Sequence, residues 1–120
     1  MNTVLVIGAT SPTAQAFIKL MERDYPEMTL KLFVRNRKKV PAYQKREHVI
    51  FLGDAAKYTD YVAALEDVDY IYDSVGGLST GPYVKLLLRA IKETQATIKR
   101  IVDTSAGGIY GEYLSGNLPY

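Results

Sequence analysis

The stretch VLVIGATSPTAQ, residues 4–15, decides the fold. An apolar, β-branched run from Thr3 to Ile7 ends at Gly8, and Ser11-Pro12 follows within three residues. Such a run is typical of a parallel strand that is covered on both faces. Serine accepts a hydrogen bond from a free N–H of the first helical turn, and proline fits the first helical position. The stretch therefore predicts a strand, a tight turn and a helix.

The same alternation continues along the chain. Strands are predicted over residues 3–7, 30–34, 49–52, 70–75 and 98–104, and helices after Ser11, over about 61–68, and from Pro82. Only a basic loop containing Pro41 is predicted between the second and third strands. Strands separated by helical segments of this length form right-handed βαβ units and a parallel sheet. We expect one domain over residues 1–120, a three-layer α/β Rossmann fold whose doubly wound parallel sheet has the strand order 3-2-1-4-5.

The segment after Ser105, AGGIYGEYLSGNLPY, is rich in glycine. It has no helical or strand period long enough to cover the fifth strand. We therefore expect the sheet to be truncated after that strand and the chain to be the N-terminal part of a longer family fold. Apolar surface on the strand-five side would then be exposed, and a homo-oligomer is one way to cover it.

The composition excludes several kinds of protein. There is no cysteine among the 120 residues, so neither a disulfide framework nor a thiolate metal site can form. The net charge of +2 is too small to indicate a nucleic-acid or membrane partner by itself. No stretch approaches the ~20 apolar residues of a membrane helix, and the N-terminus lacks the basic region of a signal peptide. We expect a cytoplasmic protein with no membrane partner and no metal.

The turn at residues 8–14 has the features of a phosphate-binding loop. Gly8, Ser11 and Ala14 occupy the positions of a G-x-x-G-x-x-G pattern at the first strand–helix junction, where free helix N–H groups can bind a pyrophosphate. Gly8 permits the tight turn, and Ala14 lets the helix pack close to the sheet. Ser11 replaces glycine at the position nearest the phosphates. A capped turn without a nucleotide is the alternative.

The basic segment after the second strand bears on the choice of cofactor. It reads VRNRKK over residues 34–39. An acidic residue about 20 positions beyond the loop would hold the ribose of NAD, whereas arginine accepts the additional phosphate of NADP. Arg35 and Arg37 therefore favour NADP, with NAD as the alternative cofactor. A solvated basic loop is the other interpretation, and no aromatic residues interleave the run as nucleic-acid binding would require.

Five segments together resemble the NmrA-like NAD(P)-binding proteins, an atypical group of short-chain dehydrogenases/reductases. The segments are GATSPTAQ, LFVRNRKK, LGDAA, DSVGG and DTSAGGIYG, each at or just after a predicted strand. The resemblance implies that the pyrophosphate lies against Thr10, Ser11, Pro12 and Thr13, the adenosine phosphate against Arg35 and Arg37, the adenine against Asp54 and Ala55, and the nicotinamide-side ribose against Val75, Gly76 and Gly77. Gly8, Asn36 and Ser105 complete the expected cofactor site.

The catalytic residues stay unassigned. Reductases of the wider family use a serine after strand five with a Tyr-x-x-x-Lys pair for proton transfer. Ser105 matches the serine, but the sequence contains no Tyr-x-x-x-Lys. Three functions therefore stay open: NADP-dependent hydride transfer to a small acceptor such as a quinone, a non-catalytic dinucleotide redox sensor of the NmrA type that contacts a protein partner, and an inactive truncated fragment.

The remaining polar residues are expected to have structural roles. Asp73 and Asp103 lie near strand ends without the flanking ligands of a metal site. His48 has no acid close to it in the sequence that would suit a catalytic pair, and is expected at the surface. Four tyrosines are expected to pack with their hydroxyls outward; they are Tyr58, Tyr61, Tyr70 and Tyr72.

Overall fold

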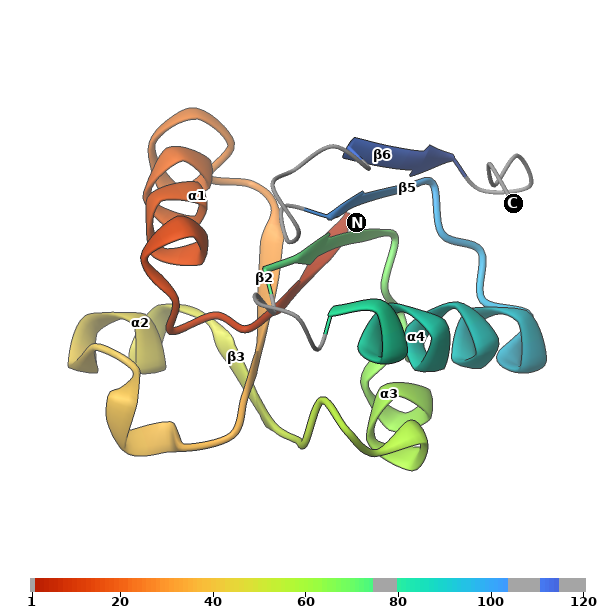
Figure 1. Cartoon of the computed structure of the whole chain (residues 1–120). Coiled ribbons are helices and arrows are strands. Elements are labelled where there is room, and N and C mark those ends of the chain that lie inside the picture. Colours follow the sequence, from red (N-terminus) through yellow and green to blue (C-terminus); the bar gives the residue numbers. More distant parts are fainter. Residues whose placement is uncertain (1, 75–79, 104–110, 115–120) are drawn as a thin grey trace.

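The computed structural model describes residues 2–74, 80–103 and 111–114, which form one mixed sheet with helices on both faces (Figure 1). The elements in chain order are β1 (Thr3–Ile7), α1 (Pro12–Asp24), β2 (Thr29–Val34), the 3-10 helix η1 (Arg37–Lys39), α2 (Ala42–Glu47), β3 (Val49–Leu52), α3 (Tyr58–Ala64), β4 (Tyr70–Asp73), α4 (Thr80–Thr94), β5 (Arg100–Asp103) and β6 (Gly111–Leu114).

The strand order is β3-β2-β1-β4-β5-β6. The first five strands pair in parallel, so the predicted order 3-2-1-4-5 is confirmed. Ile7 is in register with Phe33 of β2 and with Asp73 of β4. The segments that follow β1, β2 and β4 therefore leave the sheet at one edge, which is where open α/β sheets bind ligands.

The sixth strand was not predicted. β6 pairs antiparallel with β5, with Ile101 opposite Tyr113, so the sheet continues for one strand beyond the fifth, where the sequence showed no strand period. β6 reads GEYL, which neither alternates between polar and apolar residues nor is apolar throughout, so it carries no strand signal. What places them there is the row of backbone N–H and C=O groups along the edge of β5, which offers partners to any extended segment that reaches it.

Two apolar layers hold the sheet between its helices. The side chains of β1 alternate, so Val4 and Val6 pack with α1 while Leu5 and Ile7 pack with α3 and α4. All four are buried, as expected for a strand covered on both faces. Figure 1 shows α3 and α4 side by side on one face of the sheet and α1 on the other.

As far as the described residues show, the face of the sheet shared with α1 is open beside β4 and β5. A hollow of about 490 Å³ lies there, and most of its lining is apolar. Phe17 of α1 stacks on Tyr72 of β4 at its border, with ring centroids 3.9 Å apart. In the described part of the chain, no helix covers Val102 of β5 from this side. Among the described residues this face thus carries apolar surface on the strand-five side, while β6 pairs with the edge of β5.

Helix boundaries follow local chemistry. α1 starts at Pro12, and the Ser11 hydroxyl oxygen accepts a hydrogen bond from the N–H of Ala14 at 3.1 Å, as predicted. α4 begins at Thr80, two residues before the predicted start at Pro82. The basic loop predicted around Pro41 contains η1 and α2 instead. Three- and six-residue helices are too short to show an apolar period, which is why the sequence did not predict them.

Among the described residues, no helix is both long enough and apolar enough to cross a membrane.

Candidate cofactor site

The glycine loop, residues 8–14, connects the carboxyl end of β1 to α1. Gly8 has a φ of +73°, a left-handed conformation that residues with a side chain rarely adopt. The N–H of Ser11 donates to the carbonyl oxygen of Gly8 at 3.0 Å and closes the turn. Gly8 therefore has the role that the sequence predicted for it, which is to turn the chain sharply out of the strand.

The outer surface of this loop is accessible. Thr10, Pro12 and Thr13 are exposed and Ser11 is half-buried, whereas Ala14 is fully buried against the sheet. The first-turn N–H groups of a helix have no acceptor within the helix and carry a partial positive charge. α1 thus begins where an anion could approach it, beside the exposed residues predicted to contact the pyrophosphate.

Ser74 holds the glycine loop in place through hydrogen bonds from the end of β4. It follows β4, is buried, and its N–H donates to the Ile7 carbonyl oxygen at 3.0 Å. Its hydroxyl oxygen lies 3.1 Å from the carbonyl oxygens of Ile7 and Gly8, and 2.9 Å from the hydroxyl oxygen of Ser11. Ser74 was not among the predicted site residues. The predicted order, in which β1 and β4 are neighbours, already implied that the start of the DSVGG segment lies beside Gly8.

Two glutamines, Gln15 and Gln44, also hold the glycine loop in place. The Gln15 side-chain amide donates to the Ala9 carbonyl oxygen at 2.7 Å and to the side-chain oxygen of Gln44 at 3.1 Å. Gln44 is a buried residue of α2. The position of the glycine loop is therefore tied to α2, which also follows the basic segment. This link was also missed, because α2 itself was not predicted.

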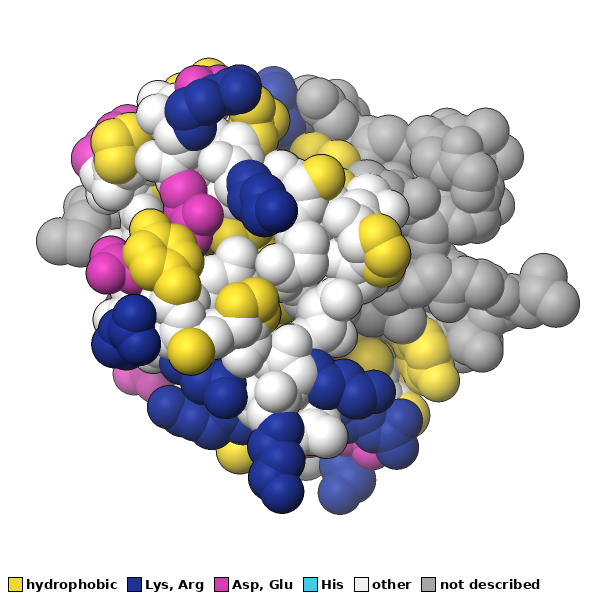
Figure 2. Space-filling view, turned by 90° about the vertical axis from the view of Figure 1, so that its left-hand side faces the viewer, with side chains coloured by type: hydrophobic (Ala, Val, Ile, Leu, Met, Phe, Trp, Pro, Cys, Tyr) yellow, Lys and Arg dark blue, Asp and Glu magenta, His cyan; other side chains and the backbone are white. Residues whose placement is uncertain are grey.

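The basic segment begins where β2 ends. Arg35, Asn36 and Arg37 are exposed, and the Asn36 side-chain oxygen accepts a hydrogen bond from the N–H of Lys38 at 2.9 Å. None of the ion pairs found among the described residues involves Arg35 or Arg37. Figure 2 shows lysine and arginine side chains gathered over the lower part of the molecule, where η1 and α2 lie. The guanidinium groups of Arg35 and Arg37 are therefore available to an anionic ligand.

The loop after β3 lies at the same edge of the sheet. The N–H of Gly53 donates to the Val34 carbonyl oxygen at 2.9 Å, which extends the pairing of β3 with β2. Asp54 and Ala55 follow and are half-buried. The Asp54 carboxylate accepts a hydrogen bond from the N–H of Ala56 at 2.9 Å, so it is already engaged within its own turn. The structure therefore brings the residues predicted for adenine to the edge that carries Gly8 and Arg35.

Four predicted cofactor residues lie outside the described residues. They are Val75, Gly76, Gly77 and Ser105. Asp73 is among the described residues; it is the last residue of β4 and is buried.

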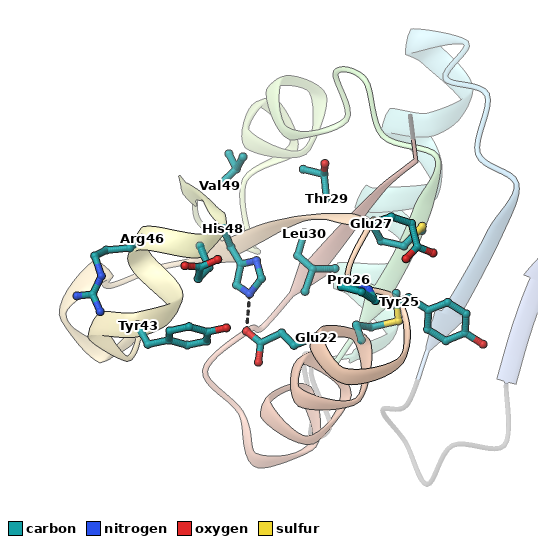
Figure 3. A pocket seen from close by; sticks show the side chains of 13 residues that line it. Glu22, Tyr25, Pro26, Glu27, Thr29, Leu30, Tyr43, Arg46, His48 and Val49 are labelled. Atoms are coloured by element: carbon teal, nitrogen blue, oxygen red, sulfur yellow. Dashed lines mark hydrogen bonds and ion pairs between the residues drawn. The ribbon is translucent and has the colours of Figure 1, made fainter.

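His48 is not the surface residue that was predicted. Only 10% of its side chain is exposed, and its Nε2 atom lies 2.6 Å from a carboxylate oxygen of Glu22. The two residues line a hollow of about 480 Å³ between the end of α1, α2 and the first residues of β2 and β3 (Figure 3). Those are the amino ends of the strands, so this hollow lies at the opposite end of the sheet from the glycine loop.

The tyrosine prediction also needs correction. Tyr61 is buried in the core, with its ring 5.4 Å from that of Phe33. Burial raises the pKa of the Tyr61 hydroxyl well above its ordinary value, and the charge of Asp73 raises it further. The expectation that this hydroxyl points outward is therefore wrong. Tyr58 does have an exposed partner, because its hydroxyl donates to the Glu93 carboxylate on α4.

The comparisons with known proteins agree with this arrangement. A family model described as NAD(P)H-binding matches residues 8–118. No curated protein matches the chain. Solved structures similar to it include a Rossmann-fold NAD(P)-binding family protein from Shigella flexneri, with 22% identity, a TM-score of 0.74, and coverage of 85% of this chain and 50% of that one.

Two further similar structures contain a nucleotide. A short-chain dehydrogenase/reductase from Veillonella parvula in complex with NADP has 16% identity, a TM-score of 0.71 and coverage of 85% and 46% of the two chains. An NADPH-dependent quinone oxidoreductase from Escherichia coli complexed with NADPH has 19% identity, a TM-score of 0.72 and coverage of 83% and 35%. The chain therefore spans half or less of the length of these proteins.

Proposed function

This chain belongs to the NAD(P)H-binding family, and from that premise we propose that it binds NADP(H) in preference to NAD(H). The observation that carries the proposal is the position of Arg35 and Arg37. Both are exposed, and they follow β2 one strand away from the glycine loop, at the same edge of the sheet. A guanidinium group binds a phosphate through parallel charge-assisted hydrogen bonds, and the additional phosphate distinguishes NADP from NAD.

The remaining contacts are assigned from the same edge of the sheet. The pyrophosphate would lie at the start of α1, against Gly8, Thr10, Ser11, Pro12 and Thr13. Asn36 would accompany the two arginines, and Asp54 and Ala55 would border the adenine. Val75, Gly76, Gly77 and Ser105 would lie on the nicotinamide side, a part of the assignment that rests on the resemblance alone. The accessible first turn of α1 and the free guanidinium groups suit the negative charge of a dinucleotide.

We further propose that the protein is an oxidoreductase. The bound dinucleotide would supply a hydride, and the chain's own residues would hold and orient it for transfer to a small acceptor such as a quinone. The similar structures from V. parvula and E. coli, a reductase with NADP and a quinone oxidoreductase with NADPH, support this choice. No catalytic residue is assigned.

A non-catalytic redox sensor is the second candidate. The sequence has no Tyr-x-x-x-Lys pair, the proton-transfer pair of the wider family, and this observation favours binding without turnover. The two candidates differ in one measurement. Oxidation of NADPH in the presence of a series of quinones would establish the reductase, whereas tight binding without oxidation would support the sensor.

The partner on the open sheet face stays a prediction. The hollow beside Tyr72 and Val102 is mostly apolar, and apolar surface of this kind favours contact with another protein surface. A homo-oligomer that covers the strand-five side is consistent with it. The expected cytoplasmic location also stays a prediction.

The cofactor preference is tested by reversing one charge. Arg35→Glu replaces a phosphate-binding group by one that repels phosphate, so NADPH should bind about 10- to 100-fold more weakly, the equivalent of one or two hydrogen bonds to a charged group. NADH affinity should change little. Lys19→Glu, an equal charge change at an exposed position of α1, is the matched control. An unchanged ratio of the two affinities in Arg35→Glu would overturn the preference.

A further inference from the structure

The two serines beneath the glycine loop form a connected set of hydrogen bonds. Ser74 Oγ is 3.1 Å from the carbonyl oxygens of Ile7 and Gly8 and 2.9 Å from Ser11 Oγ. Ser11 Oγ in turn accepts a hydrogen bond from the N–H of Ala14 at 3.1 Å. Five polar atoms thus meet within a partly buried site at the start of α1.

Proton counting fixes the direction of these bonds. Carbonyl oxygens can only accept, and a hydroxyl has one proton to donate. The Ser74 hydroxyl must donate its proton to the Ile7 and Gly8 carbonyl oxygens. Otherwise the lone pairs of Ser74 Oγ would point at the lone pairs of two carbonyl oxygens only 3.1 Å away. The proton between the two hydroxyls therefore comes from Ser11. Ser11 donates to Ser74, Ser74 donates to Ile7 and Gly8, and Ala14 N–H donates to Ser11.

This arrangement has a cost for anion binding. The N–H of Ala14 belongs to the first turn of α1, the part of a helix that offers donors to a phosphate. Here that donor is taken by Ser11 Oγ. The Ser11 proton is directed inward to Ser74, so an approaching phosphate would meet a lone pair of Ser11 instead of a donor. The Ala14 N–H and the Ser11 O–H, both potential donors to a phosphate, are therefore already engaged within the protein.

We propose that Ser11, held in place by Ser74, is an internal competitor of the cofactor pyrophosphate. Its hydroxyl caps α1 and stabilises the loop without ligand, and it lowers the affinity of the loop for the dinucleotide. Full pyrophosphate binding requires Ser11 Oγ to release the Ala14 N–H, or to turn its own proton from Ser74 to the phosphate. This inference rests on the proposed binding of the dinucleotide at residues 8–14.

The proposal makes stability and affinity change in opposite directions. Ser11→Gly and Ser11→Ala both remove the competing oxygen and free the Ala14 N–H. Both should bind NADPH roughly fivefold more tightly, the equivalent of one ordinary hydrogen bond. Ser11→Ala should also lower the melting temperature of the ligand-free protein by roughly 3–6 °C, because the cap is lost. Ser11→Gly should lower it less, because glycine is itself a favourable N-cap residue. Ser11→Ala keeps a Cβ atom and so controls for the additional backbone freedom of glycine.

Two other variants test the role of the hydroxyls themselves. Ser11→Thr keeps a capping oxygen, so it should retain the stability of the unchanged protein and show no gain in affinity. Ser74→Ala removes the acceptor that holds the Ser11 proton, so Ser11 can donate to the phosphate and NADPH should bind more tightly than to the unchanged protein. A merely structural role of Ser74 would instead weaken NADPH binding together with stability.

The experiment is a calorimetric titration of the four variants and the unchanged protein with NADPH, combined with thermal unfolding of each ligand-free protein. The expected result is tighter NADPH binding by both Ser11→Gly and Ser11→Ala, together with a clearly lower melting temperature for Ser11→Ala. If the unchanged protein binds NADPH and these variants bind it equally or more weakly, the competitor role is overturned while the proposed function stands. If none of the five proteins binds NADPH, the proposed function fails, and the inference with it.

Discussion

Gly53, at the end of β3, has no room for a side chain. A Cβ atom at this position would lie 2.6 and 2.7 Å from two ring carbons of Phe33 and 3.0 Å from one of Phe51. Carbon atoms prefer separations of about 3.5–4.0 Å, so a ring would have to move by about 1 Å. The Phe33 ring is buried, and it stacks between the rings of Phe51 and Tyr61 at centroid distances of 5.5 and 5.4 Å. It has little freedom to move.

The expected cost of Gly53→Ala follows from this geometry. Overpacking of a core costs about 1–3 kcal/mol, and the lower entropy of alanine in the unfolded chain returns about 0.4–1 kcal/mol. The two ranges leave a net loss between about 0 and 2.6 kcal/mol. Because all three ring carbons lie within 3.0 Å of the added Cβ, we expect the upper part of that range, about 1–2.5 kcal/mol, which corresponds to a fall in melting temperature of roughly 4–10 °C for a domain of this size.

Circular dichroism during heating would measure the effect of Gly53→Ala. The matched test is the double variant Gly53→Ala with Phe33→Leu, compared with Phe33→Leu alone. Without the Phe33 ring there is space for the methyl group, so Gly53→Ala should then cost little or nothing. An unchanged or higher melting temperature for Gly53→Ala alone would refute the reasoning, because it would mean that the stacked rings shift freely.

Three further predictions concern other parts of the fold. His48→Ala leaves the mostly buried carboxylate of Glu22 without its partner and should lower the free energy of unfolding in urea by about 1–3 kcal/mol; equal stability would mean that water replaces the imidazole at no cost. The pKa of Tyr61 is raised in the folded protein from an ordinary value of 10.0, so its contribution to stability is complete below pH 10 and is lost as the pH rises above it. Tyr61→Phe should therefore lose less stability than the unchanged protein between about pH 10 and 12 in urea unfolding, and parallel losses would contradict the burial of this hydroxyl. The Asp69 carboxylate accepts a hydrogen bond from the N–H of Thr3 at 2.9 Å; Asp69→Ala should speed amide hydrogen exchange at Thr3, whereas unchanged exchange would show that this bond does not hold the start of β1.

The parallel strands were predictable because each one is a short apolar run bounded by turn residues, a pattern that is visible within a few positions of the sequence. The run over residues 3–7 is apolar at every position except the first, since both faces of β1 are buried. Right-handed crossovers leave few possible topologies, and the order 3-2-1-4-5 is that of the Rossmann fold. Ser11 and Pro12 mark the start of α1 through chemistry that acts within three residues. The Gly8 turn was predictable for the same reason.

The missed features depend on contacts between distant residues. Ser74 contacts Ser11 across 63 positions, and His48 contacts Glu22 across 26. Neither pairing leaves a periodic signal, so a serine at a strand end and a lone histidine carry no information until the strands are placed. α2 is shorter than the window in which a helical period becomes visible, and the sequence GEYL of β6 neither alternates nor is apolar throughout. Tyr61 was misjudged because a tyrosine on a helix indicates burial of the ring but not of its hydroxyl.

The central claim is that the edge formed by the glycine loop and Arg35 binds a phosphorylated dinucleotide. The most direct measurement is calorimetric titration of the protein with NADPH and NADH separately, each at low and at moderate salt. We predict that NADPH binds more tightly than NADH and that the difference decreases as salt screens the exposed guanidinium groups. Equal affinities at both salt concentrations would contradict the role of the arginines, and binding of neither nucleotide would contradict the account of the site.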